Sequence, residues 1–140
     1  MEYEDFINAV ATRAKVSTDQ AATLTRATLE TLGDRISAGK ADDLAYQLPE
    51  GLDDLLRKPP PLQGRTEHAK SFGFEEFVRR VADRHTVDRS LAGVGVGAVL
   101  TTLREAVSRD DFENAMAQLP KEFRQVVEPV GAAGGRRPGS

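Results

Sequence analysis

The 140-residue sequence predicts an all-α protein made of two tandem helical repeats of about 55 residues each. Apolar residues recur at the three- and four-residue spacing of a helix, and no segment alternates convincingly as a strand would. A shift of 71 residues aligns the chain with itself without a gap. Because one repeat is too small to bury a large core, we expect the two to pack together as a pseudo-twofold bundle.

The repeat is carried by identical residues at corresponding positions. The identical pairs include Phe6 and Phe77, Val10 and Val81, Arg13 and Arg84, Leu29 and Leu100, Leu32 and Leu103, Ser37 and Ser108, and the triplets Gln47-Leu48-Pro49 and Gln118-Leu119-Pro120. Between the copies, three successive prolines remove amide donors and favour extended backbone. We therefore expect repeat 1 over residues 1–58, a proline-rich linker over 59–73, repeat 2 over 74–128 and a disordered tail over 129–140.

Each repeat is expected to begin with an amphipathic helix and continue with a long one. One stripe comprises Tyr3, Phe6, Ile7, Val10, Ala11 and Ala14, and Phe74, Phe77, Val78, Val81 and Ala82 repeat it. Ser17 or Thr18 can cap a second helix that runs to about Ser37, and its counterpart starts near Asp88.

Two shorter helices are expected to complete each repeat. The first covers roughly residues 40–47 in one copy and 110–118 in the other. The Gln-Leu-Pro turn follows, and Pro49 and Pro120 are expected to open the last helix because proline suits a first helical position.

The tandem layout, the Tyr3-Glu4-Asp5-Phe6 opening and the Gln-Leu-Pro turns resemble a bacterial family, domain of unknown function twenty-two sixty-seven. The resemblance covers about residues 1–128. It implies the helical layout, and it implies no catalytic residue and no cofactor.

Composition restricts the chemistry further. The chain has no cysteine, which excludes disulfides, thiol catalysis and cysteine zinc sites, and its two histidines, His68 and His85, lack ligand spacing. We expect no catalytic residue, no metal and no cofactor. The net charge of −3 disfavours duplex nucleic acid as a ligand. An acidic start and no apolar run of about 20 residues predict a cytoplasmic protein without a membrane contact.

The expected second long helix of repeat 2 contains three glycines within residues 93–97. They lack the strand and helix context and the lysine of a phosphate-binding loop. Gly93 and Gly97 lie one helical turn apart, and we expect them to permit close packing of another backbone or a local kink.

The candidate interaction face consists of arginines: Arg13, Arg79, Arg80, Arg84 and Arg89. Their planar donor groups suit phosphate or an acidic partner. Interleaved acidic residues equally suit an ordinary solvated face of helical ion pairs.

We expect a non-enzymatic protein-interaction or regulatory module, with self-association as one mode of partnering. Two alternatives remain at this point. The first is a nucleic-acid-associated protein that uses the arginines and Arg136-Arg137, with affinity that falls steeply with salt. The second is a small-ligand carrier or enzyme with a pocket between the repeats, near the glycine-rich helix.

Overall fold

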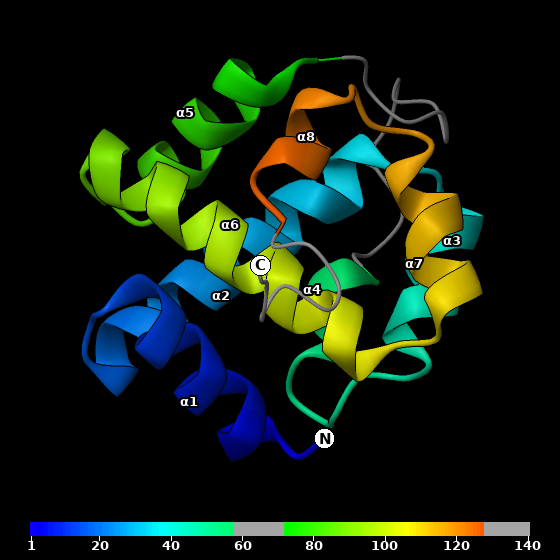
Figure 1. Ribbon diagram of the computed structural model, residues 1–140, viewed down its shortest axis with the longest axis horizontal. Coiled ribbons are helices and arrows are strands. Elements are labelled where there is room, and N and C mark those ends of the chain that lie inside the picture. Colours follow the sequence, from blue (N-terminus) through cyan, green and yellow to red (C-terminus); the bar gives the residue numbers. More distant parts are fainter. Residues whose placement is uncertain (58–71, 128–140) are drawn as a thin grey trace, which may run out of the picture.

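The computed structural model describes residues 1–57 and 72–127, which form eight helices and no β-strand, so the predicted all-α class is confirmed (Figure 1). The first four helices are α1 (Tyr3–Ala14), α2 (Thr18–Arg35), α3 (Ala38–Ala45) and α4 (Asp53–Leu56). The next four are α5 (Phe74–Arg84), α6 (Arg89–Ala106), α7 (Arg109–Met116) and α8 (Glu122–Gln125). The predicted tail and most of the predicted linker lie outside the described residues.

Side-chain caps set the starts of the long helices where the sequence predicts them. The Ser17 hydroxyl accepts a hydrogen bond from the backbone N–H of Gln20 at the start of α2. The Asp88 carboxylate accepts from the backbone N–H groups of Ser90 and Leu91 at the start of α6. These caps satisfy donors that have no partner inside the helix, so both boundaries are encoded locally.

The prediction that prolines open the last helices is wrong. α4 begins at Asp53 and α8 at Glu122, several residues after Pro49 and two after Pro120. Each proline instead begins a turn, because its carbonyl accepts a hydrogen bond from the N–H three residues later, at 3.0 and 3.1 Å.

The two long helices lie at the centre, and shorter helices pack around them (Figure 1). α1 contacts both α2 and α6, and α5 likewise contacts both α6 and α2. α3 and α7 contact each other on the side of the long helices that lies away from α1 and α5. Each half therefore packs against the other half as well as against itself.

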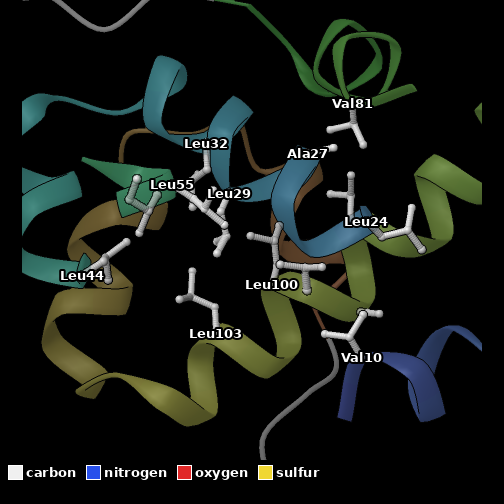
Figure 2. Packing of buried hydrophobic residues seen from close by; sticks show 14 of the residues in the cluster. Val10, Leu24, Ala27, Leu29, Leu32, Leu44, Leu55, Val81, Leu100 and Leu103 are labelled. Atoms are coloured by element: carbon white, nitrogen blue, oxygen red, sulfur yellow. The ribbon is translucent and has the colours of Figure 1, made fainter. Parts of the chain in front are cut away.

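Leucines from both long helices meet in the core. Figure 2 shows Leu29, Leu100 and Leu103 directed toward one another between α2 and α6, and each is at most 1% exposed. Burying one such side chain contributes about 1.5–3 kcal/mol relative to leaving it in water.

Three phenylalanines add an aromatic cluster to the second half. Phe123 meets Phe74 and Phe77 edge to face, with ring centroids 5.2 and 5.1 Å apart. The corresponding positions 3, 6 and 52 hold Tyr3, Phe6 and Leu52.

Among residues 1–57 and 72–127, no helix is long and apolar enough to cross a membrane.

Candidate functional site

Two of the predicted interface arginines bind carboxylates of the opposite half. The Arg13 guanidinium donates to Glu105 through both of its terminal nitrogens, at 2.6 and 3.2 Å, and also to the Thr102 hydroxyl. The Arg84 guanidinium donates to Asp34 at 2.5 Å and to Glu30 at 3.4 Å. These arginines join α1 to α6 and α5 to α2.

Arg79 and Arg80 pair within their own helix. Both donate to the Glu76 carboxylate, and Arg79 also donates to Asp83 at 2.8 Å. The hydrogen bond from Arg79, followed by that from Arg80, lowers the pKa of Glu76 to about 2. The pKa of Arg79 is raised, chiefly by the same hydrogen bond.

The arginines of the predicted interaction face therefore bind carboxylates on different helices. The carboxylates bound by Arg13, Arg84 and the Arg79–Arg80 pair lie on α6, α2 and α5 respectively. Arg89 is exposed at the first residue of α6.

The glutamines of the Gln-Leu-Pro triplets join the two halves. The Gln118 side-chain oxygen accepts from the backbone N–H of Ser37 at 2.8 Å, and its nitrogen donates to the Ser37 hydroxyl at 3.2 Å. The Gln47 side-chain oxygen accepts from the backbone N–H of Ser108 at 2.5 Å, and its nitrogen donates to Asp111 at 2.6 Å. Ser37 and Ser108 cap α3 and α7, so each glutamine supports the start of a helix in the other half.

The leucines of these triplets complete the core. Leu48 and Leu119 are each 8% exposed. The triplet therefore contributes a contact between the halves, a buried side chain and a turn.

The two glycines singled out in α6 differ in their surroundings. A Cβ added at Gly97 would lie 2.9 Å from the carbonyl oxygen of Val126, which is a close approach of backbone to helix. At Gly93 no atom lies within 4 Å of such a Cβ. Close packing therefore accounts for Gly97 and does not account for Gly93.

One surface cavity lies over the first half of α2. We call it the Arg26 groove, and it measures about 150 Å³. Its lining residues are Tyr3, Ala22, Thr23, Arg26, Gly51, Leu52, Leu55 and His85. The lining combines the apolar side chains of Ala22, Leu52 and Leu55 with a guanidinium, an imidazole and two hydroxyl groups.

A second cavity lies over the glycine-rich part of α6. We call it the Gly97 groove, and it measures about 300 Å³. Its lining residues are Arg13, Gly93, Val94, Gly97, Ala98, Thr101 and Val126. Val94 is 51% exposed.

The two grooves occupy corresponding positions in the two halves. Ala22 and Gly93, Thr23 and Val94, Arg26 and Gly97, and Leu55 and Val126 differ by 71 residues. Thr23 and Arg26 of the Arg26 groove are replaced by Val94 and Gly97, and Arg13 and Thr101 supply the polar groups of the Gly97 groove. The same place on each half therefore presents different chemistry.

His85 contributes an imidazole to the rim of the Arg26 groove. Its Nε2 atom lies 3.6 Å from a carboxylate oxygen of Glu30, which Arg84 also contacts. Across residues 1–57 and 72–127, no group of three His, Asp or Glu side chains is placed to hold a metal ion. His68 lies outside the described residues.

Sequence reasoning selected Arg13, Gly93 and Gly97, which line the Gly97 groove, and did not select the residues that line the Arg26 groove. Arg26, Thr23, Tyr3 and His85 come from α2, α1 and the end of α5, which approach one another only when the halves pack. One signal was available, since the repeat aligns Arg26 with Gly97 and so marks a position where the copies diverge.

Comparison with known proteins gives a family and no curated relative. A model of the family described as "Uncharacterized conserved protein (DUF2267)" matches residues 3–126. The search of curated proteins finds no match. The matched region includes both grooves and all eight helices. The chain therefore belongs to the family of uncharacterized conserved proteins DUF2267.

Proposed function

We propose that this chain is a non-enzymatic protein-interaction module that presents one binding groove on each of its two halves. The observation that carries the proposal is the correspondence of the Arg26 and Gly97 grooves under the 71-residue shift. A groove that recurs at the same place on both halves, with altered side chains, suits a module that holds two different protein segments.

The proposed module consists of two repeats related by a pseudo-twofold axis. Supporting contacts are reciprocal: Arg13 with Glu105 corresponds to Arg84 with Asp34, and Gln118 with Ser37 corresponds to Gln47 with Ser108.

A further support for this axis is the contact between Leu24 and Gly95. A Cβ added at Gly95 would lie 2.7 Å from a methyl group of Leu24, and the two positions differ by 71. A residue meets its own counterpart only near a twofold axis.

The grooves suit a partner better than the arginine side chains do. Arg13, Arg79, Arg80 and Arg84 already bind carboxylates of the same chain, so a partner would have to displace these ion pairs. The groove linings are open to solvent, and each combines apolar surface with a small number of polar groups, as binding sites usually do.

Site-specific photocrosslinking in cells of the source organism tests the proposal. A benzoylphenylalanine is introduced at Thr23 in one groove, at Val94 in the other and, as a control, at the exposed Asn114 on α7. We expect adducts to defined proteins from the groove positions, with no counterpart from the control. The purified partner should then lose binding to a Thr23→Lys or Val94→Lys variant that remains folded.

Other results would overturn the proposal. Adducts at Asn114 that equal those at both grooves would remove the grooves from consideration. Capture that disappears after nuclease treatment and falls steeply with salt would replace the module with a nucleic-acid-associated protein.

A further inference from the structure

We propose that the Arg26 groove binds the C-terminal carboxylate of a partner protein whose last residue has a short aliphatic side chain. This inference deepens the proposed function, because it assigns a ligand chemistry to one of the two grooves. It is argued from the charge, the lining and the size of the groove.

The charge comes from Arg26. Arg26 is exposed, and among residues 1–57 and 72–127 it has no ion pair and no hydrogen bond to a side chain. By contrast, Arg13, Arg57, Arg79, Arg80, Arg84 and Arg124 all bind carboxylates. The lining of the groove contains no acidic residue among the described residues. A guanidinium that binds no carboxylate of its own chain is available to form a bidentate pair with an incoming carboxylate.

Polar side chains lie beside Arg26 in the groove. Thr23 lies three residues before Arg26, so both side chains lie on one face of α2 beside the groove. His85 adds an imidazole at the rim, and Tyr3, whose residue is 40% exposed, adds a phenol. The Tyr3 hydroxyl can donate to a carboxylate oxygen, whereas the Thr23 hydroxyl donates to the Asp19 carbonyl at 3.2 Å and His85 Nε2 lies 3.6 Å from a carboxylate oxygen of Glu30.

The floor and the volume define the rest of the ligand. Ala22, Leu52 and Leu55 form an apolar floor, against which an aliphatic side chain gains burial. A volume of about 150 Å³ is below the usual range of about 300–1,000 Å³ for drug-sized ligands. It suits one small aliphatic group with its carboxylate, and a chain end presents these together.

Gly51 shapes this floor. Its φ of +101° is a backbone conformation that side chains rarely adopt, and it places the turn beneath the Tyr3 ring. The Gly97 groove has glycine and valine where Arg26 and Thr23 stand, and the one arginine of its lining, Arg13, already binds Glu105. The carboxylate preference is therefore a property of one half.

Titration of the full chain, followed by ¹H–¹⁵N NMR, tests the inference. The probes are isovalerate, its neutral amide, and a tripeptide ending in leucine as the free acid and as the C-terminal amide. We expect saturable shifts at residues that line the Arg26 groove. The free-acid tripeptide should bind more tightly than isovalerate, and both amides should bind at least tenfold more weakly than the matching acids.

Two variants assign the effect to Arg26. Arg26→Gln should weaken binding of the free-acid tripeptide by at least tenfold. Arg109→Gln removes one exposed positive charge from α7, outside both grooves, and should leave the binding unchanged. The spectra of both variants report whether each remains folded.

Several results would overturn the inference. These are absence of saturable shifts, equal binding of acid and amide, and equal binding by wild type and Arg26→Gln. Isovalerate binding that the tripeptide does not improve would indicate a small free acid instead of a chain end. Crosslinks from Thr23 and Val94 that persist alongside any of these results would leave the proposed function standing and remove only the ligand assignment.

Discussion

The two halves of the molecule share their helices and differ in how the long helix is used. α2 and α6 are both 18 residues long and begin at positions that differ by 71. α2 carries Thr25, Thr28 and Arg26, and α6 carries Val96, Val99 and Gly97 at the same places. The core leucines Leu29 and Leu32 recur as Leu100 and Leu103, so the two halves keep core positions and differ in the groove.

The two halves also differ in where the segment at the end of each half approaches the long helix. A Cβ at Gly33 of α2 would lie 2.9 Å from the carbonyl oxygen of Leu56, and one at Gly97 of α6 would lie 2.9 Å from that of Val126. Gly33 corresponds to Arg104 and Gly97 to Arg26, so the two close approaches occur at different points along the long helices. In the first half this leaves room for Arg26 beside the groove.

Exchange of Leu24 and Gly95 is the sharpest test of how the halves meet. Leu24→Gly alone should destabilise the protein by about 3–6 kcal/mol, because it leaves a cavity and adds a helical glycine. The double variant L24G/G95L should recover much of this loss in urea denaturation, because the leucine then enters from the other helix. A double variant as unstable as the sum of the two single variants would contradict the pseudo-twofold arrangement.

Alanine at two glycines of α6 should have opposite effects. Gly97→Ala should destabilise by about 1–3 kcal/mol, because the new Cβ meets the Val126 carbonyl. Gly93→Ala, the matched control, should stabilise by about 0.5–1 kcal/mol, because alanine is the better helix former and the space is open. Thermal unfolding measures both, and equal shifts in Tm would contradict the asymmetric packing.

Replacing two buried threonines of α2 with valine, the residue that α6 has at the same places, should stabilise the protein. The hydroxyl groups of Thr25 and Thr28 are buried and have no hydrogen-bond partner within the described ranges, 1–57 and 72–127. Thr25→Val or Thr28→Val should therefore stabilise by about 1 kcal/mol.

Thr31→Val is the control for these threonine variants. The Thr31 hydroxyl donates to the Ala27 carbonyl at 2.8 Å, so its removal should not stabilise the protein. Chemical denaturation of the three variants gives the comparison, and stabilisation by all three would show that the missing partner is not the cause.

The smallest predicted effect concerns the ion pairs of Glu76 on the surface of α5. Asn8 and Ala9 stand in the first half where Arg79 and Arg80 stand in the second. Because the pKa of Glu76 is lowered to about 2, its ion pairs contribute stability above its ordinary value of 4.5, and this is lost as pH falls toward 2.

Replacing both arginines with glutamine should return the pKa of Glu76 toward 4.5 and reduce the stability lost over that pH window. NMR titration of the Glu76 carboxyl measures the pKa. A value that stays near 2 in the double variant would assign the shift to another cause.

The sequence was sufficient for the features that depend on neighbouring residues. Helix type and the starts of α2 and α6 follow from apolar spacing and from the caps Ser17 and Asp88. The role of the Gln-Leu-Pro glutamines was missed, because Gln47 and Gln118 act on helices in the opposite half. The Arg26 groove was missed for the same reason, since His85 joins it only after packing.

The exchanged glutamine contacts have a consequence for folding cooperativity. α3 starts at a serine whose amide is satisfied by Gln118, and α7 starts at one whose amide is satisfied by Gln47. Neither half can form these contacts alone, so opening one half removes hydrogen bonds that support the start of a helix in the other. We therefore expect the chain to unfold as a single unit, and we expect two fragments cut between the halves to regain structure only by recombining.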